Sequence, residues 1–203
     1  PEPLKTIADP ACGTGGFLTN TIEHLKPFLK TAEDRITLQS TLNGVEKKPL
    51  PHMLAMTNVM LHGIDVPSNI LHDNTLSRPL RDYGTKDRVD IIITNPPFGG
   101  MEEDGIESNF PKKYQTRETA DLFMALIMHL LKPDTGRAAV VLPDGFLFGE
   151  GTKTNLKREL LESLESRRTN QEIAEALRID ERTVETHVAN ALHGRGRSDG
   201  PSR

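Results

Sequence analysis

The chain has 203 residues, a formal net charge of −4 and a hydrophobic fraction of 35%, values typical of a soluble globular protein with one main core. A net negative chain has no overall basic field, so any binding of nucleic acid must rest on a local site. The single cysteine, Cys12, excludes an internal disulfide, and because no stretch resembles a membrane span or a signal peptide, we expect a cytoplasmic protein without membrane contacts.

Strand and helix patterns alternate from Leu4 to about Glu162, which predicts an α/β fold with a parallel sheet and helices packed on its faces. The expected strands lie, in chain order, near residues 4–9, 42–47, 68–76, 88–95 and 136–145. The expected helices lie near residues 15–30, 50–63, 120–132 and 152–164. The fourth strand, "RVDIIITN", is the most apolar, as expected of a central strand covered on both faces. A polar segment over 99–118 follows it, and loops of that length are usually functional lids or disordered segments.

The sequence "DPACGTGG" follows the first strand and opens the first helix, at the sheet edge where open α/β folds bind ligands. Its glycines let the backbone approach a ligand, and the helix presents its N-terminal amides. The turn lacks both the Gly-Lys-Ser/Thr of a phosphate-binding loop and the G-x-G-x-x-G of a dinucleotide fold. Asp9 would repel a phosphate but could accept hydrogen bonds, directly or through water, from a cationic aminoacyl group, which favours S-adenosylmethionine. The predicted cofactor-binding residues of this turn are Asp9, Pro10, Ala11, Cys12, Gly13, Thr14, Gly15 and Gly16.

Two further strand ends carry candidate cofactor-binding residues. Glu46 ends the second strand, where a carboxylate can accept hydrogen bonds from both ribose hydroxyls. Asp73 and Asn74 follow the third strand, and either could take the adenine amino group or serve as a plain turn residue. A structural glycine turn with a surface glutamate is the alternative, but Asp9, the glycines and Glu46 together favour cofactor binding. We expect Cys12 to be a small packing residue.

The fourth strand ends in Asn95-Pro96-Pro97-Phe98, where two consecutive prolines stiffen the backbone and remove two donors. An exocyclic base amine is a poor nucleophile because its lone pair is delocalised into the ring. Hydrogen bonds accepted by the Asn95 side-chain oxygen and the Pro96 carbonyl would make the nitrogen more tetrahedral and able to attack a sulfonium methyl, with no metal required. Phe98 would stack on an extruded base. The alternative is a proline-stiffened strand exit with Phe98 in the core.

Several segments, taken in order, are similar to one known family. They are "DPACGTGGFL", "GVE", "DNTL", "DIIITNPPFGG", "TADLFMALIMHLLKPDTGRAAVVLPDGFLFGEG" and "LKRELL". From Ile7 to about Glu162 they resemble the modification subunit of type I restriction-modification systems, an N6-adenine DNA methyltransferase. The resemblance implies the three-layer, Rossmann-like sheet of S-adenosylmethionine-dependent methyltransferases, with the donor bound at 9–16, Glu46 and Asp73 or Asn74.

The same resemblance implies a substrate and partners. Asn95, Pro96, Pro97 and Phe98 would hold an adenine flipped out of double-stranded DNA, while a separate specificity subunit reads the sequence and a restriction subunit cuts. The family's helical N-terminal region and the last sheet strands, expected after Glu162, have no counterpart in the sequence. We therefore expect a truncated sheet with an open edge, whose unpaired strand groups bear on the stability and activity of the chain.

The C-terminal segment resembles a different family, the helix-turn-helix of LuxR-type transcriptional regulators, through "TNQEIAEAL" and "RIDERTVETHVANAL". The expected recognition helix begins at Glu181 and presents Arg182, Thr183, Thr186, His187 and Asn190. From Leu156 to the end, nine Lys or Arg residues balance nine Asp or Glu residues, so DNA binding and a packing or dimerisation role both stay open. Both families include the helix over 156–164, and one helix cannot easily satisfy two cores.

We predict three parts: a methyltransferase domain over 1–162, a small all-α helix-turn-helix segment over 163–193 and a disordered tail over 194–203. The favoured function is methyl transfer from S-adenosylmethionine to adenine N6 in DNA. One alternative is a non-catalytic DNA-binding regulator on a methyltransferase scaffold, and another is a methyltransferase acting on cytosine N4 or a glutamine amide. A cytosine C5 mechanism is excluded, because no cysteine nucleophile follows the prolines.

Overall fold

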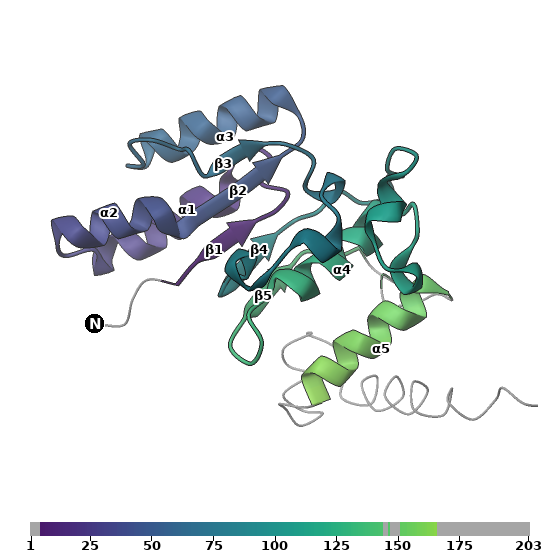
Figure 1. The fold of residues 1–203 in the computed structure, drawn as a ribbon. Helices are drawn as coiled ribbons and strands as arrows, with labels where there is room; N and C mark the ends of the chain where they lie inside the picture. Colours follow the sequence, from purple (N-terminus) through teal and green to yellow (C-terminus); the bar gives the residue numbers. More distant parts are fainter. Residues whose placement is uncertain (1–4, 144–145, 147–150, 166–203) are drawn as a thin grey trace, which may run out of the picture. The chain divides into compact units, whose positions relative to one another are not determined.

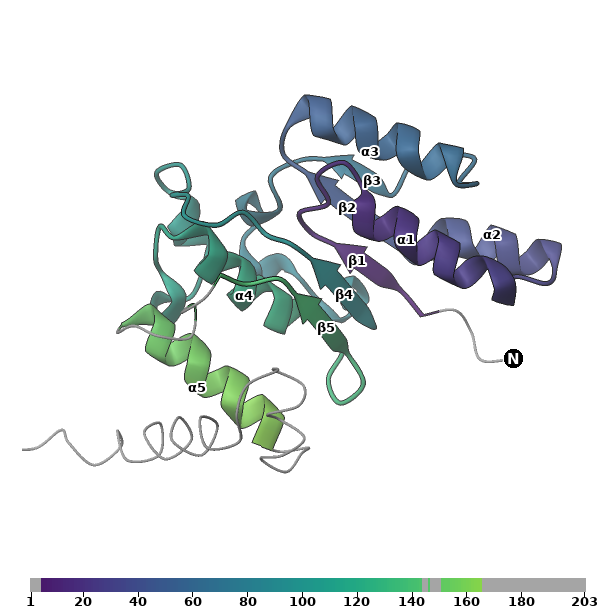
Figure 2. The ribbon, with the colours of Figure 1, turned by 180° about the vertical axis from the view of Figure 1, so that it is seen from behind.

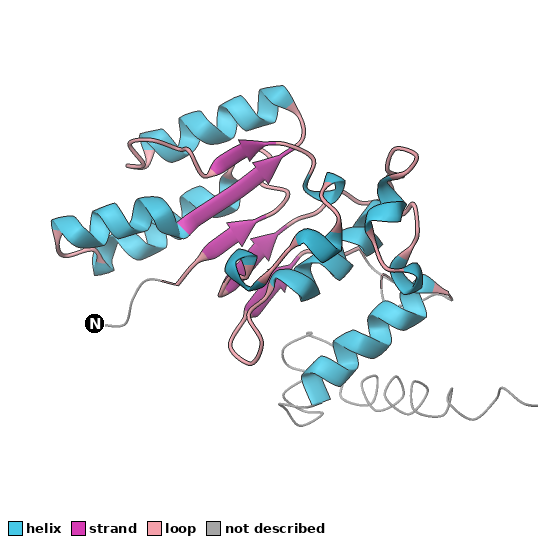
Figure 3. Cartoon of the chain, in the orientation of Figure 1, coloured by secondary structure: helices cyan, strands magenta, loops and turns pink. Residues whose placement is uncertain are grey.

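The structure is a computed structural model that describes residues 5–143, 146 and 151–165. The chain forms two compact units, Pro1–Asp144 and Gly145–Arg203. The first unit holds a sheet in the order β3-β2-β1-β4-β5, in which every pairing is parallel (Figures 1 and 3). The strands are β1 (Ile7–Asp9), β2 (Leu42–Glu46), β3 (Ile70–His72), β4 (Ile91–Thr94) and β5 (Arg137–Val140). All five predicted strands are confirmed, and with them the α/β class.

The described α-helices of the first unit include one that was not predicted. They are α1 (Gly16–Leu25), α2 (Ala32–Thr41), α3 (Pro49–Leu61) and α4 (Thr119–Leu130). The unpredicted helix is α2, whose sequence is mostly polar and shows no clear apolar stripe. The overlooked signal is a capping box, in which Thr31 Oγ1 accepts a hydrogen bond from the Asp34 amide while the Asp34 carboxylate accepts one from the Thr31 amide.

Helices α1 and α3 pack on one face of the sheet, and α4 lies on the other (Figures 1 and 2). The connections from β1 to β2 and from β4 to β5 run in opposite directions along the sheet. Because both crossovers are right-handed, their helices lie on opposite faces. The core beneath α1 and α3 joins Leu18 and Val59 to Ile7, Leu42 and Ile70. Full burial of each such side chain contributes about 1.5–3 kcal/mol, so this layer fixes the turn that precedes α1.

The two elements that follow β4 differ sharply in burial. Helix α4 is apolar around nearly its whole circumference, with buried side chains such as Leu122 and Ile127. None of the described helices, α4 included, is long and apolar enough to cross a membrane. Strand β5 pairs with β4 alone among the described strands, and the side chains of residues 137–139 are exposed. Among the described residues, no strand pairs with the other side of β5.

The segment between β4 and α4, residues 99–118, has a defined fold. It contains two short 3-10 helices, η5 (Ile106–Asn109) and η6 (Lys112–Tyr114). Phe110 and Tyr114 are buried, so the segment packs on the unit through its own aromatic side chains. The alternative of a disordered segment is therefore wrong.

The second unit is described at Phe146 and over helix α5 (Thr152–Glu165), which confirms the helix predicted near 152–164. Within this unit, Lys153 Nζ lies 5.4 Å from the centre of the Phe146 ring. Beyond Glu165, the predicted helix-turn-helix segment and tail lie outside the described residues. The domain limit at residue 162 stays a prediction.

Strands β1 and β4 lie side by side at the centre of the sheet, and the chain leaves them in opposite directions, toward β2 and toward β5. In open parallel sheets, ligands bind at such a point, outside the carboxyl ends of the strands. The predicted site residues all lie at or after the carboxyl ends of β1, β2, β3 and β4. The fold therefore brings together segments that are as far as 85 positions apart in the chain.

Candidate functional site

The turn between β1 and α1 is held closely against two other elements. Gly13 and Gly15 have left-handed backbone, with φ of 55° and 83°, which glycine adopts without strain. A Cβ at Gly15 would lie 3.3 Å from both Cα and Cβ of Ala55, so the turn packs directly on α3. The Cys12 amide donates a hydrogen bond of 2.9 Å to the Val45 carbonyl, which ties the turn to β2. The glycine turn is thereby fixed at the carboxyl edge of the sheet.

Cys12 lies inside this turn and its side chain is buried. Burial, with smaller contributions from the charges of Asp9 and Glu46, raises the pKa of its thiol to about 12. The thiol therefore stays protonated near neutral pH and is no nucleophile, in agreement with the expected packing role.

Glu46 joins the exits of β1 and β2. Its Oε2 accepts a hydrogen bond of 3.0 Å from the Gly13 amide, and its Oε1 accepts one of 2.7 Å from the Lys48 amide. Each carboxylate oxygen has a further lone pair and can accept another hydrogen bond. Glu46 therefore presents a fixed pair of acceptors beside the glycine turn, as two adjacent ribose hydroxyls would require.

Asp9 ends β1 and is only 2% exposed. Its Oδ1 accepts a hydrogen bond of 2.7 Å from the Thr94 hydroxyl and one of 3.1 Å from the Ala11 amide. Burial raises the pKa of Asp9 to about 6; the nearby charge of Glu46 adds to the rise, and the two hydrogen bonds oppose it. Because Thr94 is the last residue of β4, this contact fixes the exit of β4 to the exit of β1.

The structure separates the two candidates that follow β3. Asn74 uses both ends of its amide, because Oδ1 accepts from the Leu76 amide at 3.0 Å and Nδ2 donates to Glu102 Oε2 at 3.2 Å. Asp73 is exposed, and its own amide donates to the Glu46 carbonyl at 3.1 Å. Asn74 thus caps the short 3-10 helix η2 (Thr75–Ser77), whereas Asp73 keeps an exposed carboxylate close to the exit of β2.

The segment Asn95–Phe98 leaves β4 without regular secondary structure. Pro96 is buried, Asn95 and Pro97 are exposed, and Phe98 is 38% exposed. The alternative in which Phe98 belongs to the core is therefore wrong. The Asn95 amide and the Phe98 ring are open to a ligand directly after Thr94, at the edge that carries the glycine turn.

Three residues that shape this site were not predicted from the sequence. The Thr94 hydroxyl makes the contact between β4 and β1. The Thr75 hydroxyl donates to the Pro10 carbonyl at 2.6 Å, and Asn58 of α3 donates from Nδ2 to the Thr14 carbonyl at 2.8 Å. Thr94 and Thr75 are direct neighbours of predicted residues, which was a usable signal, whereas nothing in the local sequence marks Asn58.

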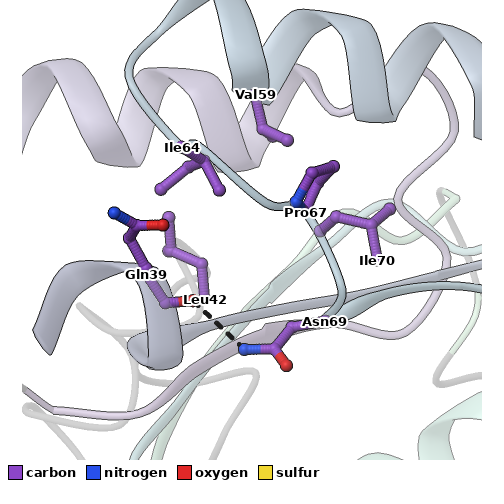
Figure 4. A pocket seen from close by; sticks show the side chains of 7 residues that line it. All are labelled: Gln39, Leu42, Val59, Ile64, Pro67, Asn69 and Ile70. Carbon is purple, nitrogen blue, oxygen red and sulfur yellow. Dashed lines mark hydrogen bonds between the residues drawn. The ribbon is translucent and has the colours of Figure 1, made fainter. Parts of the chain in front are cut away.

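A small hollow in the first unit lies away from this site (Figure 4). It is lined by residues that include Leu42, Ile64 and Ile70, near the amino ends of β2 and β3, and its volume of about 10 Å³ leaves room for about one water molecule. On its wall, Asn69 Nδ2 donates to the Gln39 carbonyl at 3.2 Å. In the part of the chain that the structure describes, no group of three or more His, Cys, Asp or Glu side chains could hold a metal ion.

Two family models match this chain. The model of the N-6 DNA methylases matches residues 1–165, and the model of the luxR family of bacterial regulatory proteins matches residues 154–193. The two matches overlap over 154–165. This overlap confirms that both families include the helix now seen as α5.

Individual relatives agree with the first of these matches. The methylase subunit of the type I restriction enzyme EcoEI from Escherichia coli is 60% identical over 163 residues, which cover 80% of this chain and 33% of that protein. The crystal structure of a modification subunit assigned to a type I restriction enzyme of Vibrio vulnificus YJ016 has a TM-score of 0.73 and 52% identity, and covers 79% of this chain and 34% of that one. The crystal structure of the EcoKI M protein has a TM-score of 0.68 and 31% identity, again over 79% and 34%. This chain spans about a third of the length of these relatives. Since a single family model matches most of it, the chain belongs to the N-6 DNA methylase family.

Proposed function

We propose that this chain contains the donor-binding and base-binding residues of an S-adenosylmethionine-dependent adenine-N6 DNA methyltransferase, as part of the modification subunit of a type I restriction-modification system. The observation that carries the proposal is the 2.7 Å hydrogen bond from Thr94 Oγ1 to Asp9 Oδ1. It joins the glycine turn to the segment Asn95–Phe98, so a methyl donor on the turn would meet an amine held after β4. The names of the relatives, methylase subunits of type I restriction enzymes, support this reaction class.

The residues after β1, β2 and β3 fit the chemistry of the donor, which supplies a methyl group on a cationic sulfonium when bound. Gly13 offers open space, since a Cβ there would meet no atom within 4 Å. Glu46 would accept hydrogen bonds from the ribose hydroxyls, and Asp9 would favour a cation above its pKa of about 6. For the adenine amino group we propose Asp73, because its carboxylate is exposed and keeps lone pairs for a ligand besides the one that accepts the Asn74 amide at 2.7 Å, whereas the less exposed amide group of Asn74 binds Leu76 and Glu102.

The residues after β4 would hold the target amine. The Asn95 side-chain oxygen and the Pro96 carbonyl would accept hydrogen bonds from its two hydrogens, which draws the lone pair out of conjugation with the ring. Pro97 has a fixed φ, so the Pro96 carbonyl stands on a stiff backbone. Phe98, 38% exposed, would stack on the extruded base. The rate enhancement would come from positioning and preorganised dipoles.

We infer that other subunits supply the remaining activities. The net charge of −4 gives the chain no overall attraction for DNA, which fits a division of labour in which a specificity subunit reads double-stranded DNA. A restriction subunit would carry out cleavage. Cytosine N4 or a glutamine amide would satisfy the same pair of acceptors, and membership of the N-6 DNA methylase family favours adenine.

A methyl-transfer assay with adenine-containing duplex DNA tests the catalytic part of the proposal. Asn95→Ala should lower the transfer rate by about 100-fold or more, because one preorganised acceptor is lost, while donor affinity stays within about twofold. The matched control is Asn69→Ala, a half-buried asparagine near the amino end of β3, which should leave transfer unchanged. Equal loss of transfer and of donor binding in Asn95→Ala would show that Asn95 serves the donor, and a wild-type chain that binds donor without transferring methyl would overturn the proposed activity for this chain.

A further inference from the structure

Glu102 is a buried carboxylate, 9% exposed, in the segment 99–118 that follows the base-binding residues. Its Oε2 accepts hydrogen bonds of 3.2 Å from both Lys47 Nζ and Asn74 Nδ2. The Thr119 hydroxyl lies 3.3 Å from its Oε1 and 3.0 Å from the Gly100 carbonyl, so these two acceptors share its one proton. One side chain therefore joins the exit of β2, the exit of β3 and the start of α4.

The backbone around Glu102 closes the segment at its base. The Glu102 amide donates to the Arg117 carbonyl at 3.0 Å, and the Thr119 amide donates to the Gly100 carbonyl at 3.1 Å. Met101 and Glu118 form an antiparallel bridge between the two ends. The segment is thus a closed loop that begins directly after Phe98.

A second anchor holds the far part of the loop to the same place. Asn109 Nδ2 donates to the Leu76 carbonyl at 3.0 Å and to the Ser77 carbonyl at 2.9 Å. Both anchors therefore reach the stretch 74–77, directly after Asp73. The loop that begins at the base-binding residues is fastened to the chain that follows the proposed adenine partner.

The position of Glu102 relates it to both halves of the site. Its partners Lys47 and Asn74 directly follow Glu46 and Asp73, the proposed ribose and adenine partners of the donor. A buried carboxylate is costly once its partners are removed. A movement at the exit of β2 or of β3 would therefore shift Glu102 and with it the loop. We propose that Glu102 is a positioning residue that couples occupation of the donor site to capture of the target base, a role that rests on the proposed function.

The test compares Glu102→Ala and Glu102→Gln with a matched control, Glu103→Ala, in the full chain. Glu103 is paired with the same lysine, at 3.1 Å from Lys47 Nζ, but its side chain is 76% exposed. Glutamine at 102 can still accept from Lys47 and Asn74 through its oxygen and meet the Thr119 hydroxyl with its amide, so it removes the charge and keeps the contacts. Thermal unfolding establishes that each variant is folded.

The first readout is amide hydrogen exchange without donor, which is independent of the proposed function. Glu102→Ala should speed exchange at the amides of residues 102 and 119 by about tenfold or more, while Glu103→Ala leaves them at the wild-type rate. Glu102→Gln should stay close to wild type, because its contacts persist. Wild-type exchange in a folded Glu102→Ala would overturn the anchoring role.

The second readout is the affinity for a duplex that carries adenine at the target position and fluorescent 2-aminopurine directly beside it, with and without S-adenosylmethionine, measured before methyl transfer takes place. In the wild type and in Glu103→Ala, donor should tighten this binding by about 5- to 10-fold, a usual size for coupling between sites. In Glu102→Ala the ratio should fall to about 1, with a value between these for Glu102→Gln.

A wild-type ratio in Glu102→Ala, or equal losses in the 102 and 103 variants, would overturn the coupling. A wild-type chain that binds no donor would overturn the proposed function and the coupling together, and the exchange experiment would still decide the anchoring.

Discussion

Asp9 is the residue at which the two halves of the site meet, and its ionisation is unfavourable in the folded chain. Burial raises its pKa from 3.8 to about 6, so the folded state holds this proton more tightly than the unfolded state does. The contribution of Asp9 to stability therefore falls as the pH rises from about 4 to 6 and is lowest above 6. A cationic donor would reverse this effect by favouring the charged carboxylate.

Asp9→Asn should make the donor-free chain more stable above pH 6, because an amide carries no charge to bury and its oxygen can still accept from Thr94 and Ala11. The upper limit of the gain is about 3 kcal/mol at pH 8, and it should vanish near pH 4. Denaturant unfolding of both proteins across this pH range measures the difference. A difference that does not change with pH would mean that Asp9 is not the group that titrates.

At the scale of the elements, β2 and α1 pack closely at Gly44. A Cβ at Gly44 would lie 2.9 Å from Leu18 Cδ1, 3.1 Å from Ile70 Cδ1 and 3.2 Å from Cys12 Sγ, all within the core beneath the glycine turn. Gly44→Ala should therefore destabilise the chain by about 1–3 kcal/mol through overpacking. The matched control is Gly16→Ala at the start of α1, where a Cβ meets no atom within 4 Å and alanine favours the helix. Chemical unfolding should rank Gly44→Ala well below wild type and Gly16→Ala at or above it; the opposite ranking would contradict the packing described here.

Element positions were largely predictable because they depend on local pattern. The apolar run before Asn95 marked β4, and the glycines at 13, 15 and 16 marked the turn and the start of α1. Helix α2 was not predicted because it has no clear apolar stripe, and its sequence signal is the Thr31 cap. No local pattern distinguishes Asp73 from Asn74, because the amide of Asn74 binds Glu102, which lies 28 positions further along the chain.

Across the whole first unit, a second polar network holds the sheet together at the edge opposite the site. Asp90, directly before β4, accepts hydrogen bonds at Oδ2 from the amide of Thr6 at 2.9 Å and from its hydroxyl at 2.7 Å, and Lys132 Nζ lies 2.9 Å from both carboxylate oxygens. The hydrogen bond from Lys132 and those from Thr6 lower the pKa of Asp90 to about 2. The network therefore ties β1, β4 and the connection between α4 and β5.

Asp90→Asn should destabilise the chain by roughly 1–2 kcal/mol at pH 7, the usual size for hydrogen bonds to a charged group that is partly exposed. Because the folded pKa is depressed, the wild-type advantage is full above about pH 4 and is lost as the pH falls toward 2. Thermal unfolding at pH 7 and pH 3 checks the sign. An advantage that grows on acidification would contradict the ionised network.

The whole-molecule arrangement explains why the sequence could predict that the candidate residues meet at one edge of the sheet, but not which contacts hold them there. Parallel strands end at one edge, so the residues after β1, β2, β3 and β4 had to meet once the alternation of strands and helices was recognised. The contacts that hold them, from Thr94 to Asp9 and from Asn58 to Thr14, join positions 85 and 44 apart and depend on side-chain packing. Such pairs follow from the folded structure alone.

Calorimetric titration of the 203-residue chain with S-adenosylmethionine at pH 8, where Asp9 is ionised, tests the central claim most directly. We predict a single donor site with a Kd below about 1 mM, and binding at least about tenfold weaker in Asp73→Ala. The matched control is Asp65→Ala, an exposed aspartate whose Oδ2 accepts a hydrogen bond from Gln39 Nε2 at 2.9 Å, and it should bind donor as the wild type does. No heat at millimolar donor from a folded chain, or equal losses in the two variants, would contradict the claim that this edge of the sheet is the methyl-donor site.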